Sequence, residues 1–173
     1  DGGRLLIGVK DNGKISGIRS EEEAYMAESA AHVFCKPAVP FILKKWVVEG
    51  KSILEVEVPV SSKRPHFVKD ENNEMIAYVR VADQNIKASS ILVRLWQNQG
   101  RGNEARLNYG KEEKALLEYL SEHDKISLSA FTRIARTNRM TAEKILINLA
   151  LMKVIEIETT EKSEYFKIRK INN

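Results

Sequence analysis

The chain has 173 residues, enough for one large domain or two small ones that each bury a core. Apolar residues make up 43% and charged residues 30%, which excludes disordered, collagen-like and disulfide-rich classes. The formal net charge of +4 permits binding to a polyanion but does not demonstrate it. Cys35, the single cysteine, excludes an internal disulfide, and the most apolar window, residues 145–152, is too short to span a bilayer. We therefore expect a cytoplasmic protein that has no signal peptide and does not contact a membrane.

The first elements along the chain are predicted to be a hairpin and a helix. Residues 4–9 and 15–18 flank the turn sequence Asp-Asn-Gly-Lys, which predicts two strands joined by that turn. Ser20 and Glu23 then fit a capping box, in which Ser20 accepts from the backbone of Glu23 while the Glu23 carboxylate reaches back. The helix should end near Cys35, because two prolines follow.

Two further hairpins and a short helix complete the predicted first module. Residues 41–49 and 52–60 are rich in β-formers, and the alternation in the second run leaves one face solvated. Residues 66–69 and 75–81 should form a third pair of strands. A short helix follows, capped by Ser89 or Ser90 and carrying Ile91, Leu92, Leu95 and Trp96. The fold class of this module is thus α+β, with a mostly antiparallel sheet.

A change of pattern marks a second module. Glycine, asparagine and glutamine gather in residues 97–108, which places a linker at 99–110 between a domain at 1–98 and a smaller one at 111–173. The second domain should contain a helix over 111–123, a brief extended piece at Ile126, a helix over 128–135, a helix capped by Thr141 and reaching residue 152, and strands over 154–159 and 165–171. This is the order of elements in a winged helix-turn-helix domain.

Three separated blocks of sequence carry a family resemblance. They are the run from Gly2-Gly3 to Gly17, Arg64-Pro65-His66, and Tyr78-Val79-Arg80-Val81. In this order, over residues 1–98, they resemble the Schlafen-type AlbA domain, which implies an AlbA-like fold, DNA binding and pairing of two copies. Ala82 stands where the family usually has glycine, so we expect the loop 83–85 to differ in conformation. The family's first helix precedes its Gly-Gly step, so we also expect natural sequence upstream of this chain, which opens without methionine.

The order of elements in residues 111–169 carries a second resemblance, together with the phrase Ile145-Leu146-x-x-Leu149-x-x-x-Lys153-Val154-Ile155. Both are similar to the winged-helix domains of bacterial transcriptional regulators. The resemblance implies a DNA-binding transcriptional regulator.

Basic residues concentrate where such a domain would meet DNA. Residues 1–98 hold 14 basic and 13 acidic side chains, whereas residues 99–173 hold 14 and 11. Five basic residues lie between Lys125 and Lys144 against one acid, Glu143. The predicted nucleic-acid interface includes Arg133, with Arg136 and Arg139 toward phosphate and Thr141, Ala142 and Lys144 toward the major groove. Contact with about four phosphates predicts a slope of log K against log salt of about −3.6. The alternative is a solvated charged face.

A second basic surface is predicted in the first module. Its members would be Arg64, His66, Lys69, Arg80 and Lys87. They would contact phosphate, and the alternative is that Arg80 pairs with Glu57 or Asp83. Two such modules side by side would double the phosphate contacts, so we expect a homodimer bound to double-stranded DNA.

Catalysis and metal binding find little support in the sequence. Schlafen cores resemble ribonucleases that hold a metal with clustered carboxylates. By this resemblance Asp11 lies at the position of the family's aspartate. The glutamates that would complete the site with Asp11 belong to the family's upstream helix. Asp11 is more simply a turn residue. His32 and Cys35 are too few to hold zinc and should lie on a half-buried helix face. We therefore expect no catalytic residue, no metal and no cofactor. Two alternatives stay open: a metal-dependent RNA-cleaving protein when full length, and a protein–protein interaction or dimerisation module.

Overall fold

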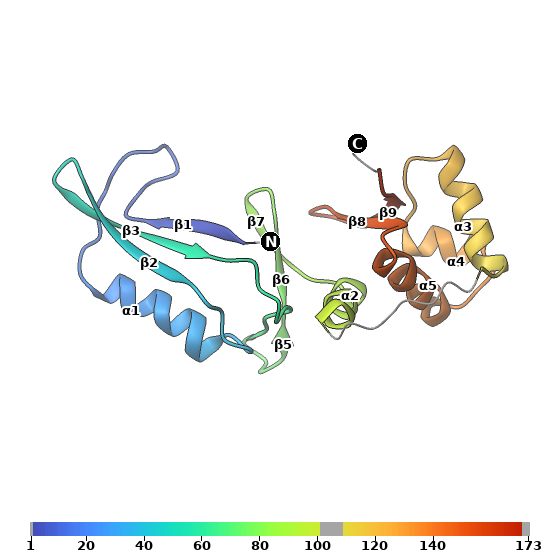
Figure 1. Ribbon diagram of the computed structural model, residues 1–173, viewed down its shortest axis with the longest axis horizontal. Coiled ribbons are helices and arrows are strands. Elements are labelled where there is room, and N and C mark those ends of the chain that lie inside the picture. Colours follow the sequence, from blue (N-terminus) through green and yellow to red (C-terminus); the bar gives the residue numbers. More distant parts are fainter. Residues whose placement is uncertain (1, 101–108, 171–173) are drawn as a thin grey trace. The chain divides into compact units, whose positions relative to one another are not determined.

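The computed structural model describes residues 2–100 and 109–170 (Figure 1). Contacts divide the chain into two compact units, Asp1–Ala77 and Tyr78–Asn173, called the N-terminal and C-terminal units. Both combine helices with small antiparallel sheets, which confirms the predicted α+β class. No helix among the described residues is both long and apolar enough to cross a membrane.

The N-terminal unit is built on a three-stranded antiparallel sheet. Its strands are β1 (Gly3–Ile7), β2 (Ile42–Val48) and β3 (Lys51–Val58), in the order β1-β3-β2. β2 and β3 form the predicted second hairpin, and Glu49 and Gly50 between them both have positive φ, which suits the twist of a two-residue turn. β3, the central strand, buries Leu54 and Val56.

The first predicted hairpin forms its turn but not its second strand. The turn over residues 10–14 closes with backbone hydrogen bonds, and Val9 and Ile15 make one isolated bridge. Beyond that bridge, the Ser16 and Gly17 N–H groups both donate to the Gly8 carbonyl, and a Cβ on Gly8 would lie only 2.9 Å from the Gly17 backbone. β1 pairs instead with β3, which is distant in the sequence, so the predicted return strand is wrong.

A helix follows this turn, as predicted. α1 (Glu22–Ser29) continues into one π-helical turn, η1 (Ala30–Phe34), and the helix ends before Cys35. Half of the predicted capping box forms: the Glu23 carboxylate accepts from the Ser20 N–H at 3.0 Å, whereas the Ser20 hydroxyl accepts from Glu22. The hydrogen bond donated by the Arg19 N–H lowers the pKa of Glu23.

The third predicted strand pair is two separate hairpins. β4 (Val68–Lys69) and β5 (Met75–Ile76) pair around a turn in which the Asp70 carboxylate accepts backbone hydrogen bonds. β6 (Tyr78–Val81) pairs with β7 (Gln84–Lys87) and belongs to the C-terminal unit. The single strand predicted over 75–81 is wrong, because the chain changes its pairing partner at the buried Ala77.

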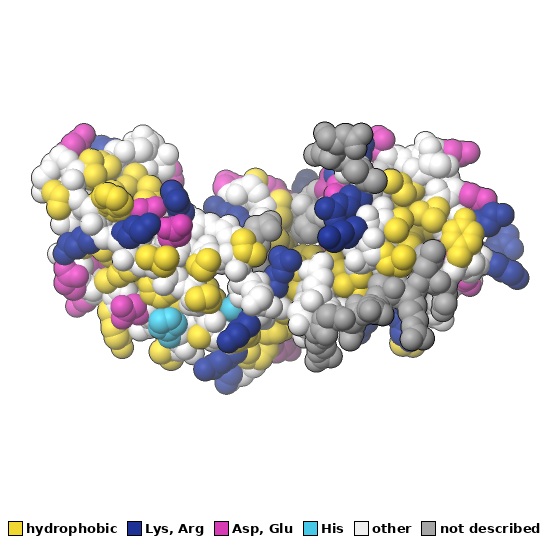
Figure 2. Space-filling model, in the orientation of Figure 1, with side chains coloured by type: hydrophobic (Ala, Val, Ile, Leu, Met, Phe, Trp, Pro, Cys, Tyr) yellow, Lys and Arg dark blue, Asp and Glu magenta, His cyan; other side chains and the backbone are white. Residues whose placement is uncertain are grey.

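Many apolar side chains of the N-terminal unit are exposed, as the yellow side chains at the left of Figure 2 show. Leu5, Tyr25, Met26 and Val47 are each more than half exposed. The buried apolar residues described in this unit are Ile53, Leu54, Val56, Pro65, Ile76 and Ala77. The core of this unit is therefore small.

The C-terminal unit holds the other described helices. After β6 and β7 come α2 (Ser90–Gly100), α3 (Lys111–Glu122), α4 (Leu128–Ile134), α5 (Arg139–Leu151), β8 (Ile155–Thr159) and β9 (Glu164–Ile168). Ser89 caps α2, as one of the two predicted alternatives, by accepting from the Leu92 N–H at 3.1 Å. Ile126 forms the predicted extended piece by pairing with Phe166.

The cap of α5 differs from the prediction. The Asn138 side chain accepts from the Thr141 N–H at 2.9 Å, so Asn138 is the capping residue and α5 begins at Arg139. Asn138 has an extended backbone, the conformation that an N-cap requires. The prediction that Thr141 caps this helix is wrong, because Thr141 already lies in the first turn.

One core joins the helices of the C-terminal unit. Leu116, Phe131, Leu146 and Phe166 have no exposed surface, and α2 adds Ile91 and Leu95 to the same cluster. The predicted first domain, residues 1–98, includes most of α2. In the structure α2 packs against α5, so its contacts lie within the C-terminal unit. The predicted domain limits follow sequence motifs and stay a prediction. Residues 101–108 of the predicted linker lie outside the described residues.

Candidate functional site

The turn between α4 and α5 carries much of the predicted interface. α4 ends in a Schellman motif, in which the Thr137 N–H donates to the Thr132 carbonyl at 3.1 Å and the Arg136 N–H to the Arg133 carbonyl at 3.3 Å. Arg136 takes the left-handed position of this motif, with a φ of 49°. Glycine is usual there because it has no Cβ. An arginine at this position keeps backbone strain and places a cation in the turn.

The first turns of α5 present one exposed face. Met140, Lys144 and Asn148 follow one another at four-residue spacing and are exposed, with the half-buried Thr141 beside them. Ala142 is fully buried. The expectation that Ala142 faces a groove is wrong, because it lies on the side of α5 that packs into the core.

Glu143 holds two arginines. Its side chain is only 8% exposed, and its carboxylate accepts from Nε of Arg139 at 2.8 Å and from a terminal nitrogen of Arg94 at 3.2 Å. Arg139 is thus partnered by an acid on its own helix. Sequence reasoning missed both pairs, although the four-residue spacing of Arg139 and Glu143 is a signal that predicts the first. Arg94 comes from α2, and no local signal connects it with Glu143.

Lys125 is also paired. Its Nζ lies 3.1 Å from a Glu158 oxygen and 4.5 Å from the centroid of the Tyr165 ring. Glu158 pairs in addition with Lys167 at 3.3 Å, and the hydrogen bonds from Lys125 and Lys167 lower the pKa of Glu158. Residues 155–168, which form the β8–β9 hairpin, hold four acidic and two basic side chains, so the hairpin is acidic rather than positive.

Three members of the predicted basic cluster keep an uncompensated charge. Arg133, Arg136 and Lys144 are exposed, and none of them pairs with an acid within residues 2–100 and 109–170. They lie on α4, the following turn and α5. The positive charge that the sequence spreads over five side chains is thus concentrated on these three.

The residues predicted for a second basic surface belong to both units. In the N-terminal unit, Nδ1 of His66 donates to the Pro37 carbonyl at 2.7 Å, and Nε2 lies 2.7 Å from the Ser61 hydroxyl. Both ring nitrogens are therefore engaged, and His66 joins two loops. Arg64 beside it is half-buried, whereas Lys69 is exposed.

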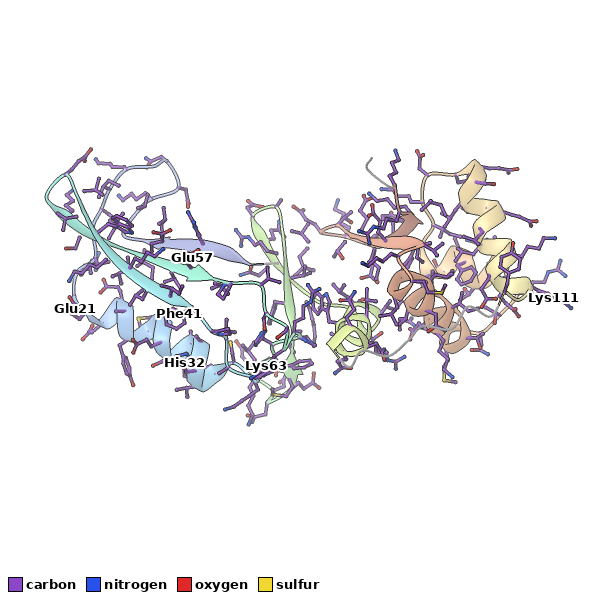
Figure 3. The ribbon with its side chains drawn as sticks, viewed as in Figure 1. Glu21, His32, Phe41, Glu57, Lys63 and Lys111 are labelled. Carbon is purple, nitrogen blue, oxygen red and sulfur yellow. The ribbon has the colours of Figure 1, made fainter. Side chains whose placement is uncertain are left out.

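Arg80 and Lys87 lie on the β6–β7 hairpin of the C-terminal unit, and both are exposed. Arg80 donates to Oδ1 of Asn85 at 3.2 Å. Glu57, one of the predicted partners of Arg80, is paired with Lys44 at 2.7 Å and is labelled in Figure 3. Because the Asn85 amide is neutral, the guanidinium of Arg80 keeps its net charge.

The model of the family described as Schlafen, AlbA_2 matches residues 1–89, more than half of the chain. The chain belongs to the Schlafen AlbA_2 family. No curated protein and no solved structure matches it. The Schlafen AlbA_2 match ends at Ser89, the cap of α2, so it includes the β6–β7 hairpin but not the helices from α2 onward.

In this Schlafen AlbA_2 chain, the turn between β6 and β7 holds a non-glycine residue in the left-handed conformation. Ala82 has a φ of 51° in the two-residue turn between β6 and β7. A residue with a Cβ pays about 1–2 kcal/mol for this left-handed conformation, which glycine adopts freely. Glycine would therefore suit this turn better than alanine does. The predicted difference in the loop 83–85 stays a prediction.

Asp11 of this Schlafen AlbA_2 chain is exposed in the turn after β1. The side-chain hydrogen bond of this turn comes from its neighbour, because Oδ1 of Asn12 accepts from the Lys14 N–H at 3.1 Å. The turn role expected of Asp11 therefore belongs to Asn12.

His32 and Cys35 were expected on a half-buried helix face. Cys35 is half-buried, and burial raises the pKa of its thiol. Cys35 lies just after the helix, in extended backbone, so its half-burial is confirmed but its place on a helix face is not. His32 is on the helix but exposed, and its ring centroid is 5.4 Å from that of Phe41 (both labelled in Figure 3). In the described part of the chain, no three His, Cys, Asp or Glu side chains gather as a metal site would require.

Proposed function

We propose that this Schlafen AlbA_2 chain is a DNA-binding transcriptional regulator, and that α3 to β9 form a winged helix-turn-helix domain. Family membership is consistent with nucleic-acid binding. The order of α3, the extended piece at Ile126, α4, α5 and the β8–β9 hairpin supports the winged-helix assignment. The shared burial of Phe131, Leu146 and Phe166 supports its packing as one body.

The observation that carries the proposal is the set of unpaired cations beside the exposed face of α5. In the proposed complex, Arg133 and Arg136 bind phosphates, and Thr141 and Lys144 reach base edges in the major groove. Arg139 is 75% exposed, so it adds donors beyond the one that Glu143 accepts.

The roles proposed for Arg136 and Lys144 are tested by measuring overall affinity for DNA and preference among DNA sequences separately. Arg136→Gln should weaken binding to all duplexes alike, whereas Lys144→Gln should change which sequences are selected from a random duplex library. Lys111→Gln is the matched control, because it removes an exposed lysine at the start of α3 (labelled in Figure 3) and should change neither quantity. If Arg136→Gln and Lys144→Gln behave alike, the roles are wrongly assigned. If no duplex binds even at low salt, the interaction-module alternative replaces the proposal.

The proposal includes a homodimer. A two-fold pair would present two α4–α5 sites to DNA and double the phosphate contacts. Light scattering of the free protein should then give twice the chain mass of 19.7 kDa. A monomer at the concentrations that bind DNA would remove the dimer from the proposal.

The proposed mechanism is binding, not catalysis. Labelled RNA and DNA incubated with the chain and Mg²⁺ or Mn²⁺ should stay intact. Metal-dependent cleavage that Asp11→Asn abolishes would instead support the ribonuclease alternative.

A further inference from the structure

We propose that the exposed face of the β6–β7 hairpin binds a single-stranded segment of nucleic acid, with Tyr78 stacked on an unpaired base and Arg80 and Lys87 bound to phosphates. The inference rests on the proposed nucleic-acid binding of the chain. It concerns different residues from those of α4 and α5, so the two sites can be tested apart.

The hairpin has two chemically different faces. Side chains alternate along a strand, and the register pairs Tyr78 with Lys87 and Arg80 with Asn85. One face therefore carries Tyr78, Arg80, Asn85 and Lys87. The apolar members of the opposite face are Val79, Val81 and Ile86, which are all half-buried. The apolar face supplies the packing of the hairpin, and the polar face is open to solvent.

Tyr78 is an aromatic side chain available for stacking. It is 49% exposed, and among the described residues no other ring or cation stacks on it. Lys87 stands directly opposite, with the two Cβ atoms about 5 Å apart as in any paired position. Proteins hold single strands by stacking bases on such rings while cations follow the phosphates. A base within a duplex is already stacked on both faces, so Tyr78 suits an unpaired base.

The same face is positively charged. Arg80 is oriented by Asn85 at 3.2 Å without being neutralised. Lys87 has no acidic partner in the described ranges 2–100 and 109–170. Asp83, the acid closest in sequence, lies in the turn and outside the paired positions. Two cations flanking an exposed ring complement a nucleotide, which has an anionic phosphate and a flat base.

The test titrates the full chain against fluorescent single-stranded RNA, single-stranded DNA and a duplex of the same sequence. Tyr78→Ala should weaken single-strand binding by about five- to a hundredfold, whereas Tyr78→Phe should keep it, because the ring remains. Tyr25→Ala is the matched control. It removes a tyrosine that is 70% exposed on α1, which also carries Glu22 and Glu28, and should change nothing.

The contribution of the two cations is measured by salt dependence. Each phosphate contact on a single strand changes the slope of log K against log salt by about 0.7. Combining Arg80→Gln with Lys87→Gln should therefore flatten the single-strand slope by about 1.4.

The outcomes separate this inference from the proposed duplex binding. Loss of single-strand binding in Tyr78→Ala, with duplex binding unchanged, supports the inference even if the α4–α5 proposal fails. Wild-type single-strand affinity of Tyr78→Ala overturns the inference and leaves the duplex proposal standing. An equal loss for duplex and single strands also overturns it, since the ring is then not reading an unpaired base. If Tyr78→Ala has a lowered melting temperature, the double charge variant decides, and an unchanged slope overturns the inference.

Discussion

Replacing Arg136 by glycine should stabilise the C-terminal unit and weaken its binding to DNA at the same time. Arg136 has a φ of 49° at the left-handed position that ends α4. A side chain in this conformation costs about 1–2 kcal/mol, and glycine avoids that cost but loses about 0.5–1 kcal/mol through its greater freedom when unfolded. We expect a net gain of about 0.5–1 kcal/mol, which raises the melting temperature by a few degrees.

The same substitution removes one of three unpaired cations. If Arg133, Arg136 and Lys144 each neutralise one phosphate, the slope of log K against log salt is about −2.7 per bound chain, and two contacts give about −1.8. Between 50 and 200 mM salt, affinity per chain then falls about 40-fold for the wild type and about 12-fold for the variant. Fluorescence anisotropy of a labelled duplex at several salt concentrations measures both slopes. Because the variant is the more stable protein, misfolding cannot explain its weaker binding.

Lys153→Gly provides the matched control. Lys153 has a φ of 60° at the corresponding position after α5, where the Val154 N–H donates to the Leu149 carbonyl at 3.0 Å. This variant should gain similar stability and bind DNA as the wild type does. Equal salt slopes for Arg136→Gly and the wild type would refute the phosphate role of Arg136. Lowered melting temperatures of both variants would refute the strain argument.

Three further predictions test the fold by urea or thermal unfolding. Asn138→Ala should lower the free energy of unfolding by about 1 kcal/mol through loss of the α5 cap, and Thr141→Ala should not; the reverse order would make Thr141 the cap after all. Ala82→Gly should raise the free energy of unfolding by about 0.5–1 kcal/mol, and a decrease would contradict the left-handed turn. Burial raises the pKa of Glu164, although the hydrogen bond from Ser89 opposes the shift. The folded chain therefore holds the Glu164 proton more tightly than the unfolded chain does, and stability falls as the pH rises above the ordinary pKa of glutamate and the carboxyl ionises. Glu164→Gln removes this loss, so it should raise the melting temperature relative to the wild type more at pH 7 than at pH 4. Equal increases at both pH values would rule out this assignment.

Local signals predicted most of the elements because their causes lie within a few residues. The Asn12-Gly13 turn, the helix end before Pro37 and the cap at Ser89 each depend on neighbouring backbone groups. The α5 cap was misplaced by three residues, since Asn138 and Thr141 are both acceptable capping types and only the observed hydrogen bond distinguishes them.

Long-range partners could not be predicted from the sequence. The apolar run in β1 indicates a strand, but nothing in its periodicity specifies β3 as its partner instead of the nearby residues 15–18. The run 75–81 likewise reads as one strand, although its two halves pair with different neighbours. Tertiary contacts decide both cases.

The number of basic residues in the sequence indicates where the candidate site lies, but not which of these side chains are free of an acidic partner. Counting treats Lys125 and Arg136 as equal, whereas Lys125 is paired with Glu158 and Arg136 is not paired with an acid in the described residues. In the sequence, Glu143 is a single acid in a basic stretch. In the structure it is buried and paired with both Arg139 and Arg94, and the pair with Arg94 requires α2 to pack against α5. Sequence spacing could have predicted one of these pairs, Arg139 with Glu143.

The salt dependence of duplex binding by the full wild-type chain tests the central claim most directly. Three phosphate contacts at the α4–α5 turn predict a slope of log K against log salt of about −2.7 per bound chain, or about −5.4 for a dimer that uses both sites. A slope near zero would contradict the claim that Arg133, Arg136 and Lys144 bind the DNA backbone.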